Sequence, residues 1–208
     1  MYKPLTEDDK ISDVAIVTSG VFQDGASSIT TFHTSSTQYT NTGDYNVDVY
    51  RYDPGTNTSA SVQFGVAYGH AEGSASLGTL GATGDRTTAA VFGQFNNMIN
   101  PPQTQRFKFS GLDDVKQFYS LTFNRARIRE SLEPGGWEIH INDGAHTVKL
   151  IDDSSTNKGG NTDQRNFSPE YNIVSGTLVG GTTINTTAID EGTTIGSYGL
   201  FYPSLGSL

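Results

Sequence analysis

The segment Ser59–His70, SASVQFGVAYGH, constrains the fold of this chain more than any other feature. Its larger apolar side chains recur at every second position, on a face that carries Ala60, Val62, Phe64, Val66 and Tyr68. Because successive side chains of a strand point to opposite faces, this alternation predicts a β-strand. The preceding segment Tyr45–Asp53 alternates in the same way, and the five residues PGTNT separate the two. A β-hairpin is the natural interpretation.

The composition extends this prediction to the rest of the chain. Of the 208 residues, 24 are Gly, 26 are Thr and 20 are Ser, so turn-forming and strand-compatible residues make up a third of the sequence. The sparse Leu, Ala, Glu and Lys exclude a helical bundle or a coiled coil. No apolar run reaches membrane-spanning length, and the amino-terminal residues MYKPLTEDDK are polar and acidic. We therefore expect neither a membrane span nor a secretory signal.

Charge and cysteine content exclude several functional classes. The chain has 13 basic and 22 acidic residues, a formal net charge of -9, which argues against binding to nucleic acid phosphates. It contains no Cys, so disulfides, thiolate zinc sites and cysteine nucleophiles are excluded together.

Short strand-sized runs continue along most of the sequence. They lie at Ile11–Thr18, Ser27–His33, Arg106–Gly111, Val115–Ile128, Trp137–Ile141, His146–Ile151, Tyr171–Leu178, Thr183–Ile189 and Tyr198–Tyr202. The turn NDGA predicts a second hairpin between two of them. Gly-rich or polar segments at 73–85 and 154–166 are expected to be loops. We predict a flexible arm over residues 1–10, followed by a single β-rich domain over residues 11–208.

One segment has the period of a helix instead. Val91, Phe92, Phe95, Met98 and Ile99 would share one helical face, starting near Thr87 and ending before Pro101 and Pro102. We expect this face to be buried against the sheet. The predicted fold class is therefore mainly β, an antiparallel β-sandwich or open barrel with one short helix.

Candidate metal sites have weak support. His140 and His146 flank the second hairpin, but no H-x-H or H-E-x-x-H spacing occurs, which favours ordinary surface histidines. The acidic loop Asp152–Asp163 resembles a calcium loop but lacks Gly at its sixth position and contains Lys158. A solvated loop is the default interpretation, with a calcium site of another type left open.

Catalytic patterns are equally weak. The carboxylate pairs Glu130 with Glu133 and Asp113 with Asp114 lie too close in sequence to predict a glycosidase geometry. The chain lacks the G-x-S-x-G elbow of serine hydrolases, and its Gly-rich GATGD segment lacks a P-loop lysine. No catalytic, cofactor-binding or metal-ligating residue is predicted, and we expect a protein without cofactor that is not an enzyme.

The main basic concentration suggests an interface. Arg125, Arg127 and Arg129 alternate, so a continuous strand would place their guanidinium groups in one row. Such a row could bind an acidic partner surface through bidentate pairs. The alternative is neutralisation by carboxylates of the same chain, which adds little stability at a surface.

Several segments together resemble a known group of phage proteins. They are SGVFQDGASSITTFHTSSTQ at 19–38, VQFGVAYGHAEGSASLG at 62–78, FNRARIRESLEPGGWEIHI at 123–141, KLIDDSS at 149–155 and YNIVSGTL at 171–178. In this order they resemble the VrlC-type structural proteins of T4-like myoviruses that infect marine cyanobacteria. The resemblance spans about residues 14 to 205 and includes no active-site signature.

The resemblance implies a virion component of a contractile-tailed bacteriophage, in the tail or baseplate, assembled in the host cytoplasm. Its partners would be other virion proteins, with homo-oligomers in a symmetric assembly. A competing interpretation is a carbohydrate-binding β-sandwich on the phage particle, with Tyr50 and Tyr52 as a modest aromatic platform. A β-rich hydrolase has only scattered carboxylates in its favour.

Overall fold

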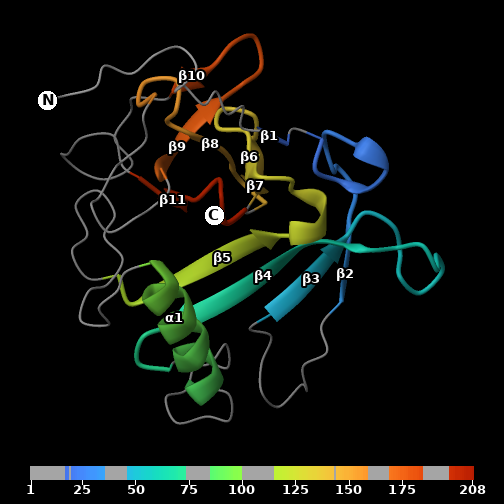
Figure 1. Ribbon diagram of the computed structural model, residues 1–208, viewed down its shortest axis with the longest axis vertical. Helices are drawn as coiled ribbons and strands as arrows, with labels where there is room; N and C mark the ends of the chain where they lie inside the picture. The colour runs from blue at the N-terminus through green and yellow to red at the C-terminus, as the bar shows by residue number, and fades with distance from the viewer. Residues whose placement is uncertain are drawn as a thin grey trace, which may run out of the picture.

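The described part of the chain contains two antiparallel sheets, one α-helix and a short parallel strand pair (Figure 1). The computed structural model describes residues 17–18, 20–35, 46–73, 85–99, 115–142, 144–158, 169–184 and 197–208. The mainly β class predicted from the sequence is confirmed, and the sheets do not close into a barrel within these residues. The same residues contain no helix of the length and apolarity that crossing a bilayer requires.

The first sheet has the order β2-β3-β4-β5. Its strands are β2 (His33–Ser35), β3 (Asn46–Tyr50), β4 (Val62–His70) and β5 (Gln117–Phe123). The predicted hairpin is confirmed, because β3 pairs antiparallel with β4, with a register shift between Val49 and Tyr50. The predicted strand at Ser27–His33 is misplaced, since pairing begins at His33, opposite Tyr50 of β3.

The second sheet runs β10-β9-β8-β7, and a further strand, β11, also pairs with β9. Its strands are β7 (Ile139–Asn142), β8 (Thr147–Asp152), β9 (Tyr171–Thr177), β10 (Thr183–Ile184) and β11 (Gly199–Phe201). The hairpin predicted around Asp143-Gly144 is confirmed by the antiparallel register of β7 and β8. Gly144 has a φ of 94°, a conformation that glycine adopts without strain.

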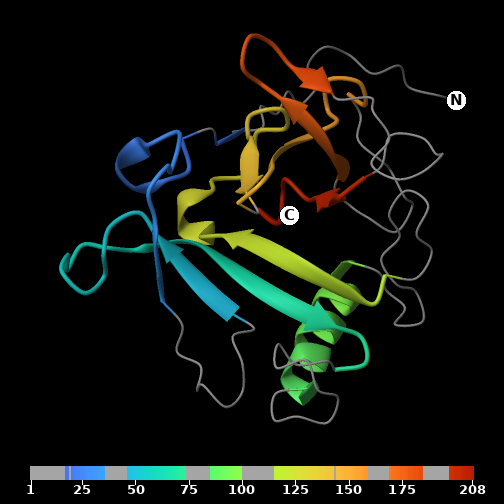
Figure 2. The same cartoon turned by 180° about the vertical axis from the view of Figure 1, so that it is seen from behind.

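Helix α1 (Asp85–Ile99) packs on β4, as both views show (Figures 1 and 2). Its close approach depends on Gly69, where a Cβ would lie 2.9 Å from the Phe118 ring and 3.1 Å from the Phe92 Cα. The predicted helix is thus confirmed, but the prediction of which residues form its buried face is partly wrong. Phe92 and Ile99 are buried, whereas Met98 is 52% exposed.

The correction follows from helical geometry. The buried face carries Thr88, Phe92, Asn96 and Ile99, at spacings of three and four residues. Met98 lies six residues after Phe92, which is 240° around the helix axis at about 100° per residue. The buried face therefore includes two polar residues, Thr88 and Asn96, that the predicted apolar face did not contain.

The main apolar core lies beside the second sheet. Its buried members are Val21, Ile128, Leu132, Leu150, Tyr171, Ile173 and Phe201. A smaller cluster under α1 joins Phe92, Ile99 and Val115 to Tyr202. The two-residue strands β1 (Val17–Thr18) and β6 (Ser131–Leu132) pair in parallel next to the main core. A short 3₁₀ turn, η2 (Gln23–Gly25), follows β1.

Several predictions fall outside the described residues. These are the arm over residues 1–10, the first part of the strand Ile11–Thr18, the strand Arg106–Gly111, the later part of Thr183–Ile189 and most of both predicted loops. The single-domain organisation over residues 11–208 stays a prediction.

Candidate functional site

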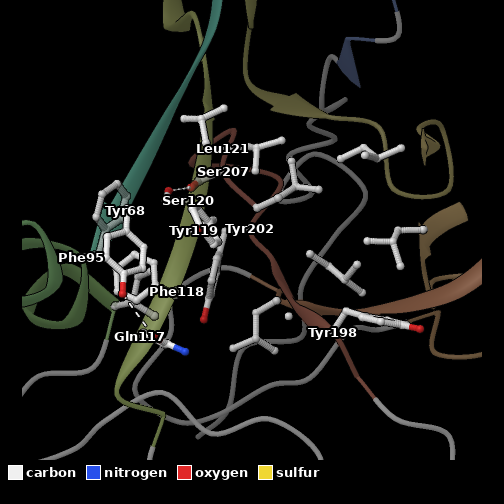
Figure 3. A pocket seen from close by; sticks show the side chains of 18 of the residues that line it. Tyr68, Phe95, Gln117, Phe118, Tyr119, Ser120, Leu121, Tyr198, Tyr202 and Ser207 are labelled. Carbon is white, nitrogen blue, oxygen red and sulfur yellow. Dashed lines mark hydrogen bonds between the residues drawn. The ribbon is translucent and has the colours of Figure 1, made fainter. Parts of the chain in front are cut away.

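A cleft of about 650 Å³ lies between the first sheet and the second (Figure 3). One wall is formed by β4 and β5, the other by β7, β8, β9 and β11, and the C-terminal residues lie between them. Clefts of this size with mainly apolar walls are the usual form of binding sites in proteins. It is the candidate site of this chain.

Aromatic side chains dominate the wall made by β4 and β5. The paired residues Tyr68 and Tyr119 point to the same face, with ring centroids 5.1 Å apart. The Tyr68 hydroxyl donates to the Gln117 side-chain oxygen at 3.1 Å, a bond that Figure 3 draws. Burial raises the pKa of Tyr68, and the neighbouring Tyr119 raises it further. Tyr119 itself is 69% exposed, so its ring is open to a ligand or partner.

The opposite wall is aliphatic and also partly open. Ile139 of β7 pairs with Leu150 of β8, and Ile141 pairs with Val148. Ile139, Ile141 and Leu150 line the cleft. Ile141 is 53% exposed and Tyr198, before β11, is 41% exposed. Exposed apolar side chains thus occur on both sides of the opening.

The C-terminal residues close the bottom of the cleft. Ser207 forms a buried hydroxyl contact with Ser120 at 3.3 Å, and Leu208 pairs with Leu121 through two backbone hydrogen bonds of 2.9 Å. Burial raises the pKa of Tyr202, and the Glu170 carboxylate raises it further, so the phenol stays protonated at neutral pH. Tyr202 therefore adds no charge to this end of the cleft.

The chemistry of the cleft suits binding better than catalysis. None of the described residues that line it is acidic, basic or a histidine. General acid-base catalysis needs a group that exchanges a proton near neutral pH, and tyrosines with raised pKa values do not meet that need. What the cleft offers is apolar surface, aromatic rings, and the amide and hydroxyl groups of Gln117, Tyr68 and Tyr119.

The structure does not arrange the three predicted interface arginines in a strand. β5 ends at Phe123, and Arg125–Arg127 form a 3₁₀ turn, η3, because the Asn124 side chain accepts from the Ala126 backbone N–H. Arg127 is half-buried, and its guanidinium donates to the Ser61 hydroxyl at 2.5 Å. Arg125 donates weakly to the carbonyls of residues 130 and 204.

The prediction that a continuous strand places Arg125, Arg127 and Arg129 in one row is therefore wrong. Arg127 connects η3 to the segment before β4, which is a structural contact within the chain. Arg125 and Arg129 are exposed, and Arg129 has interactions of its own. An interface through these arginines stays a prediction.

Tyr50 and Tyr52, the predicted aromatic platform, do not lie on the same strand. β3 ends at Tyr50, whose hydroxyl lies 3.3 Å from that of Ser35. Tyr52 lies in the following bend, and its hydroxyl donates to Asp24 at 2.7 Å. The Arg51 guanidinium lies 5.3 Å from the Tyr52 ring centroid. These contacts hold η2 against the loop after β3.

The remaining polar candidates have structural partners. His140, on β7, contacts the Glu138 carboxylate, whereas the exposed His146 lies between the turn and the start of β8. Asp152 accepts from the backbone N–H of Gly135 and Ser154, and Asp153 accepts twice from Asn172. Within the described ranges, no three His, Cys, Asp or Glu side chains are grouped so that they could hold a metal ion.

Sequence reasoning did not find the cleft. One wall joins two strands more than forty residues apart in the chain, β4 and β5, and the pairing of Tyr68 with Tyr119 depends on their register. The sequence alone indicates only that Tyr68 shares a strand face with the apolar residues of Ser59–His70 and lies at the end of that face.

No protein-family model, curated protein or solved structure gives a significant match to this chain.

Proposed function

We propose that the chain is a structural virion protein of a contractile-tailed bacteriophage, a tail or baseplate component that acts through contacts with other virion proteins. The observation that carries this proposal is the partly exposed, uncharged cleft with Tyr119, Ile141 and Tyr198 at its opening. The resemblance to VrlC-type proteins supports the virion assignment.

The cleft has the composition of a protein interface. Interface cores are depleted in charged residues and enriched in Tyr, as this cleft is. Fully burying one large apolar side chain contributes about 1.5–3 kcal/mol. Several such side chains at one opening therefore supply enough binding free energy for a specific contact. The net charge of -9 limits self-association at other surfaces.

Incorporation into particles tests the proposal. The double variant Tyr119→Ser and Ile141→Ser removes apolar surface from both walls, while Val179→Ser is a matched control at a residue that is 75% exposed and does not line the cleft. We expect purified particles to contain at least tenfold less of the double variant and normal amounts of the control. Equal incorporation of both, at equal melting temperature, would contradict the proposal.

A carbohydrate-binding module on the particle is the second candidate. Its specific support is the open Tyr119 ring beside the Gln117 amide, an aromatic surface next to a hydrogen-bonding group. A glycan array probed with the native chain and with Tyr119→Ala separates the two functions. Binding that the substitution abolishes favours the glycan function, and no binding leaves the protein interface.

A further inference from the structure

The turn η2 holds Asp24 in an unusual backbone conformation, directly before a glycine. In the described part of the chain, Asp24 is the one non-glycine residue with a positive φ, which is 60°, and Gly25 follows with a φ of 68°. The Asp24 side chain is 60% exposed. A backbone of this kind persists only where surrounding contacts hold it. The conformation of η2 therefore depends on the contacts of Asp24.

Two side chains of the loop after β3 hold the Asp24 carboxylate. The Tyr52 hydroxyl donates to its Oδ2 atom at 2.7 Å, and the Arg51 guanidinium lies 3.8 Å from the same oxygen. The backbone N–H of Gly25 donates elsewhere, to the Phe22 carbonyl at 3.1 Å. The carboxylate and the amide that follows it are thus held by different partners.

These two groups can react with each other. When the amide nitrogen after an Asp attacks the Asp Cγ, a five-membered succinimide ring forms. The new bond joins nitrogen to Cγ, and a carboxyl oxygen leaves as water with the amide proton and the carboxyl proton. Water then opens the ring: breaking the bond from nitrogen to Cγ restores Asp, whereas breaking the bond from nitrogen to the main-chain carbonyl gives isoaspartate. A following glycine favours the attack, because its backbone is the least restricted.

We propose that Asp24 is a site of spontaneous isomerisation to isoaspartate, and that the Tyr52 hydroxyl and the Arg51 guanidinium suppress this reaction in the folded chain. The reaction proceeds only while η2 is locally open, with the carboxylate and the Gly25 N–H released from their partners. Local opening is fast compared with this slow chemistry, so the rate follows the population of the open turn. Tyr52 protects the site and takes no part in the reaction.

Isoaspartate at position 24 would disturb the contacts between η2 and the start of β4. The main chain would run through Cβ and Cγ, which adds one carbon atom beside Gln23. The Gln23 N–H donates to the Gln63 side-chain oxygen at 2.6 Å, and the Gln23 side chain donates to the Ser59 carbonyl at 2.8 Å. Gln63 is fully buried, so its amide would lose a partner without gaining water. We therefore expect the isoaspartate form to melt at a lower temperature.

The substitution Tyr52→Phe tests the protection, because it removes the hydroxyl and keeps the ring. Tyr50→Phe is the matched control, since the Tyr50 hydroxyl lies 3.3 Å from that of Ser35 on the neighbouring strand. The native chain and both variants are incubated at neutral pH, and isoaspartate at residue 24 is measured over time by peptide mapping. Hydrogen exchange of the Gly25 amide is the second readout. Incubation in concentrated urea gives the rate of each unfolded chain.

We expect isoaspartate at residue 24 to form about tenfold or more slowly in the folded native chain than in urea. Tyr52→Phe should raise the folded-state rate about fivefold or more, because a hydrogen bond to a carboxylate is stronger than one between neutral groups. Exchange of the Gly25 amide should accelerate by the same factor. Tyr50→Phe should leave both rates unchanged, and the three chains should react equally in urea.

Four results would overturn the inference. These are equal rates for the native chain with and without urea, no effect of Tyr52→Phe, equal effects of the two substitutions, or a faster reaction in Tyr52→Phe without faster exchange of the Gly25 amide. The comparison with urea needs no variant, so it holds even if a substitution prevents folding. The inference goes beyond the proposed function and does not depend on it, because incorporation into particles is not among its readouts.

Discussion

Removing the charge of the Glu138 carboxylate should destabilise the fold. The Glu138 side chain is only 12% exposed, and it accepts from the Leu178 backbone N–H at 2.7 Å and the Thr177 hydroxyl at 2.9 Å. His140 contacts it, and the Lys149 ammonium lies 3.5 Å away. The Leu178 hydrogen bond and then the His140 contact hold the pKa of Glu138 at about 2, against a partial opposing effect of burial.

The pKa sets both the sign and the size of the effect. Because the folded-state pKa of Glu138 lies below the ordinary value of 4.5, its contribution is complete above that value and is lost as pH falls toward 2. One pKa unit corresponds to 1.36 kcal/mol, so the ceiling is about 3 kcal/mol at neutral pH. Glu138→Gln keeps an acceptor for Leu178 but loses the charge, and we expect a cost of about 2 kcal/mol at pH 7.

Urea unfolding of the native and Glu138→Gln proteins from pH 5 to pH 3 isolates the part of the stability that depends on protonation of Glu138. Comparing the two proteins at each pH leaves the titration of the Glu138 carboxylate as the main difference between them. The difference in free energy of unfolding between the native and Glu138→Gln proteins should fall by about 2 kcal/mol from pH 5 to pH 3. The exposed residue Glu133 provides the control, because Glu133→Gln removes the same charge. A difference that is independent of pH, or the same pH dependence in the control, would refute the reasoning.

Other substitutions test the packing. Phe92→Ala should cost about 3–5 kcal/mol in urea unfolding, whereas Met98→Ala, on the exposed side of α1, should cost less than about 1 kcal/mol. Gly206→Ala should cost about 2–4 kcal/mol by thermal unfolding, because the φ there is 66° and the new Cβ would clash with the buried Ile128 side chain. In the same assay Arg127→Ala should cost about 1–3 kcal/mol and Arg125→Ala less than about 0.5 kcal/mol; equal values would contradict a structural role for Arg127.

The parts of the fold that sequence predicted depend on local patterns. Both hairpins follow from alternation on each side of a turn, and the register of β3 with β4 keeps Val47 opposite Val66. The predicted strand Val115–Ile128 runs past the observed end of β5, although the apolar positions change phase after Phe123, to Ala126 and Ile128. Asn124 stops the strand by bonding to the Ala126 N–H, a local competition that alternation does not represent.

The helix face and the cleft depend on tertiary packing. Thr88 and Asn96 are buried because α1 is rotated to bring Phe92 against Gly69 and Phe118, and nothing in the helix sequence favours a polar residue there. The cleft requires β5 to lie opposite β7, although the two strands belong to different sheets. The carboxylates of Asp152 and Asp153 resembled metal ligands in sequence because their backbone partners become visible only in the fold.

If the proposed function holds, a neighbouring subunit contacts the cleft beside β5, and a map of the intact particle that resolves this chain tests that contact most directly. We predict that side chains of another subunit contact Tyr119, Ile141 and Tyr198 at the opening of the cleft. A chain located in the particle with solvent in that cleft and its contacts elsewhere would contradict the account.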